Sequence, residues 1–197
     1  MVAVVVAGGI VWELLQPSEP LYEGKSISYW LHHGMESAND GSFHVGGKLV
    51  GAVIVEHMPN FDSNALPYLV KTVKNRGSAF HAVATWSWNK LPARLQKRFD
   101  KPLPASALRL RALVMLGHLQ AEALPAVPDL IRVLKSDDDA TVRLMTVDCL
   151  AQIDRQNPQV REALTAAALD KDRTVRAEAI LQLQGTYNSP VDRVWEF

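Results

Sequence analysis

The sequence predicts an all-α fold, an α-solenoid built from antiparallel helical hairpins that stack side by side. Three arginines, Arg109, Arg143 and Arg176, recur 34 and 33 residues apart. Each lies in one apolar frame, with Leu or Val before it, Ala or Thr three residues later and Leu seven residues later. These frames are Leu108, Ala112 and Leu116; Val142, Thr146 and Leu150; and Val175, Ala179 and Leu183. Such a period predicts stacked hairpins, because a single hairpin cannot bury its own apolar face.

Composition supports one globular domain. The 197 residues are 48% hydrophobic and 21% charged, and the net charge is zero. The charge is segregated, since ten Lys and Arg between Lys71 and Arg111 stand against one acidic residue, Asp100. Cys149 is the only cysteine, which excludes an intramolecular disulfide and a metal site built from cysteines. We interpret it as a structural core residue.

Residues 1–20 are predicted to be an apolar segment and a linker. Val2–Trp12 contains only apolar residues and glycines, and no Lys or Arg precedes it. As a helix it would span about 17 Å, against roughly 30 Å of hydrocarbon. Two interpretations are open: the distal half of a signal anchor whose start lies upstream, or a short buried helix that caps the domain. We favour the anchor, because Gln16–Pro20 resembles a tether.

Residues 21–61 are predicted to form an N-terminal helical cap region. Ser26 is placed to cap a short helix that buries Trp30 and Leu31. Residues 34–47 are rich in Gly, Asn, Asp and Ser and predict a loop. Leu49–Met58 predicts a helix, despite its β-branched residues, which Pro59 would stop.

Residues 62–184 are predicted to be the repeats, with an insertion at 92–104 marked by three prolines and basic residues. Ala65–Val73 predicts one helix, and Phe80–Leu91 predicts its partner. Five helices joined by short turns follow: Leu108–Leu119, Ala126–Lys135, Thr141–Ile153, Val160–Leu169 and Thr174–Gln184. The tail, 185–197, contains Val191, Val194, Trp195 and Phe197 and is apolar enough to cover the last repeat as a cap.

The chain resembles the HEAT repeat family, specifically the short bacterial HEAT-like units that also occur in phycobilisome lyase-type proteins. The matching segments are Ala126-Val-Pro-Asp-Leu-Ile-Arg-Val-Leu-Lys135, Asp137-Asp-Asp-Ala-Thr-Val-Arg143 and Asp172-Arg-Thr-Val-Arg176. In addition, Tyr22-x-Gly-Lys25 with Trp30-Leu31 is similar to bacterial HEAT proteins that carry an N-terminal membrane anchor. The resemblance implies an armadillo-like solenoid that binds proteins through its concave surface, and it implies no reaction.

An inter-repeat ladder of charge pairs is also expected. Asp139 and Asp172 stand where helices begin and can cap them, while Arg143 and Arg176 can reach the aspartate of a neighbouring repeat. A third copy keeps Arg109 but has Ala105 in place of the aspartate. If such pairs are exposed, each contributes about 0 to 1 kcal/mol. Arg143→Ala is then expected to cost visibly less than Leu150→Ala, which is expected to cost about 2 to 5 kcal/mol.

The sequence contains little that points to catalysis. The six histidines lack the spacing of a helical metal site, and residues 137–139 are not followed by the glycine and glutamate of a calcium loop. Neither a phosphate-binding loop nor a nucleophile motif is present. We therefore expect no enzymatic activity, no metal and no cofactor.

The basic stretch between Lys71 and Arg111 is the one candidate for binding chemistry. The residues singled out for an anionic partner are Lys90, Arg94, Lys97, Arg98 and Lys101, interleaved with Trp86, Trp88 and Phe99. The favoured interpretation is a solvated face that pairs with the acidic C-terminal repeats; an acidic protein or lipid surface and nucleic acid are the alternatives. The predicted function is a non-catalytic protein-protein interaction scaffold tethered to a bacterial membrane, or cytoplasmic if untethered. The alternative is a nucleic-acid-binding HEAT solenoid.

Overall fold

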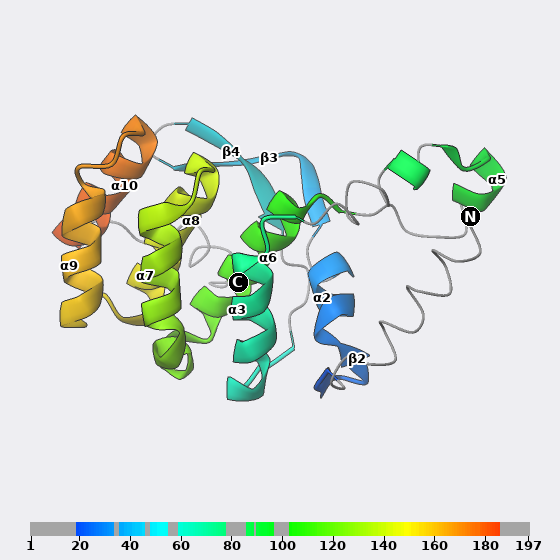
Figure 1. The fold of residues 1–197 in the computed structure, drawn as a ribbon, viewed down its shortest axis with the longest axis horizontal. Helices are drawn as coiled ribbons and strands as arrows, with labels where there is room; N and C mark the ends of the chain where they lie inside the picture. Colours follow the sequence, from blue (N-terminus) through cyan, green and yellow to red (C-terminus); the bar gives the residue numbers. More distant parts are fainter. Residues whose placement is uncertain are drawn as a thin grey trace.

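The structure, a computed structural model, describes residues 19–33, 36–45, 48–54, 59–77, 86–88, 90–96 and 103–185. Its main body is a stack of helical hairpins in two layers (Figure 1). The first layer contains α3 (Leu66–Lys74), α7 (Val127–Ser136) and α9 (Pro158–Ala167), and the second contains α6 (Ala105–His118), α8 (Ala140–Asp154) and α10 (Arg173–Gln184). The prediction of an all-α solenoid is confirmed.

Each hairpin pairs one helix of the first layer with one of the second: α3 with α6, α7 with α8, and α9 with α10. A 3₁₀ segment, Gln120–Ala126, joins α6 to α7. In the described part of the chain, α3 packs against α6. Most of the expected partner, Phe80–Leu91, lies outside the described residues, and so do residues 97–102 of the expected insertion, 92–104. The described part of that insertion contains the short helix α5 (Ala93–Gln96).

The helices begin where the sequence provides a side chain that accepts backbone N–H groups. Asp139 accepts from the N–H of Thr141 at 2.9 Å, and Asp172 accepts from that of Thr174 at 2.8 Å. These are the predicted N-caps, and they satisfy donors that have no partner within the helix. At the other end of α10, Gly185 adopts φ 66° and stops the helix.

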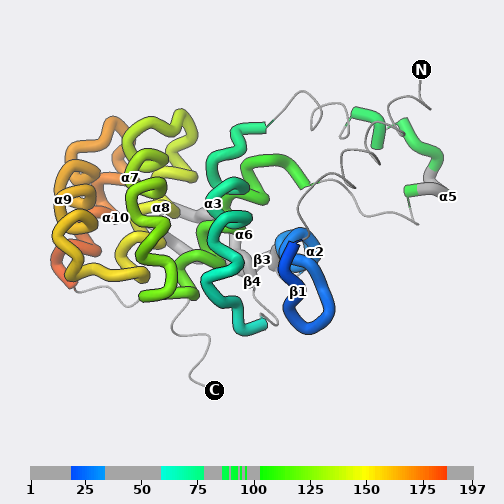
Figure 2. Tube along the Cα trace, turned by 60° about the horizontal axis from the view of Figure 1, so that its bottom comes forward, coloured from blue at the N-terminus to red at the C-terminus, as the bar shows by residue number. Residues whose placement is uncertain are grey.

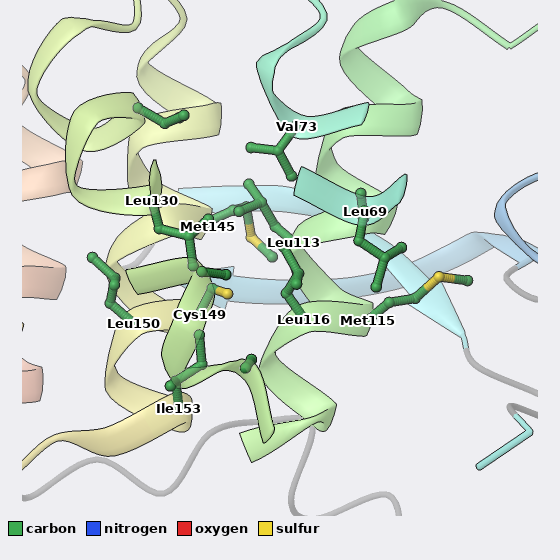
Figure 3. Packing of buried hydrophobic residues seen from close by; sticks show 14 of the residues in the cluster. Leu69, Val73, Leu113, Met115, Leu116, Leu130, Met145, Cys149, Leu150 and Ile153 are labelled. Carbon is green, nitrogen blue, oxygen red and sulfur yellow. The ribbon is translucent and has the colours of Figure 1, made fainter. Parts of the chain in front are cut away.

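The core lies between the two layers (Figure 3). Leu113 and Leu116 of α6, Leu130 of α7 and Leu150 of α8 are all at most 1% exposed. Cys149 is buried at 2% exposure, and its burial raises the pKa of the thiol well above its ordinary value. The apolar positions that defined the repeat are thus the positions through which the helices pack.

The N-terminal unit lies at one end of the stack, beside α3 and α6 (Figure 2). It contains the short strands β1 (Leu21–Tyr22) and β2 (Lys25–Ser26) and the helix α2 (Ile27–His33). The predicted helix is confirmed, with Trp30 and Leu31 buried and Ser26 Oγ accepting from the N–H of Tyr29 at 3.2 Å. Arg111 fixes the unit to α6, because its Nη1 donates to the carbonyls of Leu31 and His32, both at 2.8 Å.

The segment after α2 is a β-hairpin rather than the predicted loop and helix. Strand β3 (Glu36–Val45) pairs antiparallel with β4 (Lys48–Ile54), with Val45 opposite Lys48. The prediction for Leu49–Met58 was wrong for residues 49–54. The physical reason is that β-branched residues favour extended backbone, and a Gly-Gly pair in the sequence between two strand segments favours a tight hairpin turn.

The structure leaves the predicted membrane anchor untested. Within the described ranges, no helix has both the length and the apolar character needed to cross a bilayer. Residues 1–18, which hold nearly all of the expected anchor, lie outside those ranges.

Candidate interaction surface

Buried arginine-aspartate pairs link successive repeats. Arg143 is 2% exposed, and its Nε and Nη2 donate to the two carboxylate oxygens of Asp170 at 2.9 and 2.8 Å. Its Nη1 donates to the carbonyl of Asp137 at 2.8 Å, so one guanidinium joins two interhelical turns. One repeat earlier, Arg109 also makes a bidentate pair with Asp137, but through Nη1 and Nη2, and its Nε donates to the carbonyl of Val73 at 2.7 Å. This bidentate geometry fixes the spacing of the repeats.

The aspartates that pair with Arg109 and Arg143 differ from those expected. Asp139 and Asp172 cap their helices, whereas the carboxylates of Asp137 and Asp170, two residues earlier, receive the arginines. The reason is the Asp-x-Asp spacing of the turns, in which the first aspartate also accepts the N–H of the second, at 3.1 Å in one turn and 2.7 Å in the other. The repeated Asp-x-Asp was a sequence signal that could have identified these partners.

The ladder aspartates are held ionised. Burial opposes ionisation of Asp170, but the hydrogen bonds from Arg143 and from the N–H of Asp172 outweigh it and lower the pKa. Asp137 follows the same pattern: burial alone would raise its pKa, but hydrogen bonds from Arg109 and from the N–H of Asp139 outweigh this effect and lower the pKa. Both carboxylates therefore stabilise the fold at neutral pH and lose this contribution in acid.

Several cations of the basic stretch bind groups of the same chain. Lys74 Nζ lies 3.2 Å from a carboxylate oxygen of Asp129, and Arg76 Nη1 lies 3.2 Å from one of Asp138. Arg109 and Arg111 are used in the ladder and in holding α2. These contacts support pairing with the acidic C-terminal repeats. Of the residues proposed for an anionic partner, Lys90 and Arg94 are exposed, and Lys97, Arg98 and Lys101 lie outside the described residues.

A polar network that sequence reasoning missed joins α8 to α10. Gln182 is 1% exposed, and its Nε2 donates to Glu178 Oε1 at 2.8 Å and to Asp148 Oδ1 at 3.3 Å. Arg155 Nη2 donates to Gln182 Oε1 at 3.0 Å. Glu178 stands two residues after its repeat arginine, where α6 has Arg111 and α8 has Met145. The sequence repeat gave no signal for this network, because the three repeats carry an apolar or a charged residue at the position of Glu178.

Glu178 is a destabilising member of this network. It is fully buried, and its Oε2 has no hydrogen-bond partner among the described residues. Burial raises the pKa of this carboxyl, and the hydrogen bond from Gln182 opposes the shift only in part. In the unfolded chain, a glutamate has a pKa of about 4.3. Because the folded-state pKa of Glu178 is higher, its ionisation above about pH 4.3 costs free energy in the folded state and lowers the stability of the protein.

We expect Glu178→Met to raise the free energy of unfolding at pH 7 by about 1 to 3 kcal/mol, because methionine is the residue that α8 carries at this position and it removes an unpaired buried carboxyl. The measurement is urea unfolding between pH 3.5 and 8. The gain is expected to grow with pH through the raised pKa of Glu178. Glu162→Met, on the exposed face of α9, serves as the control. A Glu178→Met variant less stable than the native protein at pH 7 would contradict the prediction.

The outward sides of the two layers differ in chemistry. At 100° per residue, positions one and five after each repeat arginine face away from the first layer. These residues are Leu110, Val114, Leu144, Asp148, Ala177 and Leu181; Leu144 is buried and the others are half-buried. By contrast, the exposed side of the first layer is mostly polar and includes Lys71, Arg132, Lys135, Arg161 and Glu162. The half-buried apolar residues of this outward row are the candidate interaction surface.

Comparison with known proteins identifies the repeated part of the chain. Residues 92–184 match the family model described as HEAT repeats, a range that contains α5 to α10. Neither the curated proteins nor the solved structures gave a match.

Proposed function

We propose that this chain is a non-catalytic scaffold for a protein partner, because residues 92–184 match the model of HEAT repeats, and HEAT repeats generally mediate protein-protein interaction. The observation that carries the proposal is the difference between the two layers. The outward row of the second layer is apolar at five of its six positions. The cores of protein interfaces have this character, whereas the charged side of the first layer resembles ordinary solvated surface.

The ladder supports the proposal, because it makes the surface rigid. Arg109 and Arg143 each hold two successive repeats in one register, so Val114 on α6 and Leu181 on α10 stay at a fixed spacing. A preorganised surface loses little conformational entropy on binding, which favours affinity. On α8, Gln152 Nε2 donates to Asp148 Oδ2 at 2.7 Å, so these polar side chains are also held in place.

Two finer parts of the proposal concern the N-terminal part of the chain. Tethering to a membrane by residues 1–20 is supported by the apolar run Val2–Trp12. Nucleic-acid binding is the alternative, and it has less support because Lys74, Arg76, Arg109 and Arg111 bind groups of the same chain. Its remaining basis is the exposed Lys71, Lys90 and Arg94, together with three cations outside the described residues.

Site-specific photo-crosslinking tests the scaffold function. A photoreactive amino acid is placed at Val114 or Leu181 on the second layer, and at Arg132 or Arg161 on the first as matched controls. We expect a protein to be captured from the second-layer positions only. The captured protein, once purified, should bind the native chain at least tenfold more tightly than the Leu181→Glu variant. Equal capture from all four positions would contradict the proposal, and retention on heparin at 0.2 M salt without protein capture would favour the nucleic-acid alternative.

A further inference from the structure

At the C-terminal end of the stack, the ladder arginine is Arg176, and among the described residues the carboxylate that would pair with it is missing; we call this the open place in the ladder. Arg143 and Arg176 use Nη1 in the same way, because both donate to two carbonyls of the preceding turn. The distances are 2.8 and 3.3 Å for Arg143, to Asp137 and Asp138, and 2.7 and 3.1 Å for Arg176, to Asp170 and Lys171. Arg143 then binds Asp170 of the next repeat through Nε and Nη2. In the described part of the chain, no carboxylate takes that position at Arg176.

Exposed apolar residues surround this open place. Ile180 is four residues after the repeat arginine, and the residues at the equivalent position, Leu113 and Val147, face the next repeat and are 1% and 0% exposed. Ile180 is 43% exposed, and Leu169, in the turn before α10, is 85% exposed. We call Leu169, Arg176 and Ile180 the C-terminal edge. It needs an occupant that provides a carboxylate beside apolar side chains.

We propose that the chain's own tail, residues 186–197, occupies the C-terminal edge, with Asp192 pairing with Arg176. The tail has the required chemistry, because Asp192 is flanked by Val191, Val194 and Trp195. It continues the chain directly from the end of the last repeat, so it is present at the edge at high effective concentration. The apolar residues then cover Ile180 and Leu169, while the carboxylate completes the bidentate pair that Arg143 makes with Asp170.

The length of the tail permits this arrangement. From Arg176 to the end of α10 at Gln184, the helix rises about 12 Å. Gly185 ends the helix in a left-handed conformation, which redirects the chain. Residues 186–192 can span up to about 23 to 25 Å when extended, roughly twice the distance they must cover.

A second copy of the chain fits the edge less well than the tail. Head-to-tail stacking would bring the first repeat of one copy against Arg176 of another. Alignment of the α3 and α7 helices places Arg76 of the first repeat where the second has Asp137. Such a contact would oppose two arginines, and like charges at close range are repulsive. Repeat proteins need a cap at each end to stop open-ended association, and the tail provides one.

A double-mutant cycle in the full chain tests this inference independently of the proposed partner. The variants are Arg176→Gln, Asp192→Asn and the double variant, with Arg173→Gln as a control on an exposed arginine of the same helix. We expect each single substitution to lower the folding equilibrium constant about threefold to tenfold. The double variant should lose no more than the larger single effect. Hydrogen exchange of backbone amides in 186–197 should be at least threefold faster in either single variant and unchanged in Arg173→Gln.

Two results would overturn the inference. The first is additive losses with unchanged exchange in the tail, which would mean that Arg176 and Asp192 do not meet. The second is concentration-dependent self-association of the native chain that Arg176→Gln abolishes and Asp192→Asn leaves intact. That result would assign the edge to a second copy.

Discussion

Replacing Arg143 with alanine is expected to lower the free energy of unfolding by about 3 to 5 kcal/mol. The guanidinium is 2% exposed and makes a bidentate pair with Asp170, whose side chain is 12% exposed. Removing it leaves a partly buried carboxylate without its counter-ion and the carbonyl of Asp137 without its donor. Removal of one partner from a buried pair is costly because the other keeps its desolvation penalty. Urea unfolding at pH 7 measures the loss.

Arg132→Ala is the matched control for Arg143→Ala. Arg132 also pairs with an aspartate, Asp129, at 2.6 Å, but its side chain is 70% exposed. Its removal is expected to cost less than about 1 kcal/mol, because water screens the pair in the folded protein and solvates the remaining carboxylate. A loss for Arg143→Ala as small as that of the control would contradict the assignment of the ladder.

The pH dependence gives Arg143→Ala a second signature. The lowered pKa of Asp170 stabilises the fold above its unfolded value of about 3.9, and this contribution is lost as pH falls through the lowered folded-state value. Without Arg143, the pKa of Asp170 returns toward its unfolded value. The gap in unfolding free energy between the native protein and the variant should therefore narrow between pH 7 and pH 2.5.

This expectation revises the ranking made from the sequence, which placed Arg143→Ala well below Leu150→Ala. The period of 33 to 34 residues located Arg143 correctly, because helix packing repeats with the chain. The exposure of Arg143 could not be predicted in the same way, because it depends on how closely the turn that contains Asp170 approaches the Arg143 side chain. A sequence window around one repeat does not contain the loop of the next one.

The architecture was predictable where one physical pattern dominated. The apolar frames around Arg143 and Arg176 identified α8 and α10, and Asp139 and Asp172 identified where they begin. Prediction failed where patterns competed. The run 49–54 is apolar enough for a buried helix, but its β-branched residues beside Gly46-Gly47 favour a hairpin. The contact of α3 with α6 was also not predicted, because local spacing carries no information about a contact between helices so far apart in the chain.

The candidate interaction surface was likewise predictable from the sequence only in part. The positions one and five after each arginine follow from helix geometry, so Leu110, Val114 and Leu181 could be placed on the outward row from the sequence alone. The network of Gln182, Glu178 and Asp148 could not, because it depends on which side chains of α8 and α10 meet between repeats. Sequence periodicity thus locates faces of helices, whereas specific polar contacts require the tertiary structure.

Replacing Leu150 with alanine is the second substitution with a large expected effect, a loss of about 2 to 5 kcal/mol. Leu150 has no exposed surface and belongs to the buried core (Figure 3), on a helix that packs against α6, α7 and α10. Truncation removes buried methyl groups and leaves a cavity that helices held on several sides cannot collapse to fill. Leu21→Ala, at a site 68% exposed, is the control and should change stability by less than about 0.5 kcal/mol.

The losses of unfolding free energy in Arg143→Ala and Leu150→Ala are expected to respond differently to acidification. A cavity at Leu150 carries no charge, so the stability gap between Leu150→Ala and the native protein should stay constant from pH 7 to pH 2.5. The gap for Arg143→Ala should shrink over the same range, because its origin is the ionised carboxylate of Asp170. If both gaps shrink in parallel, the loss at Arg143 does not arise from the ion pair, and the ladder contributes through packing alone.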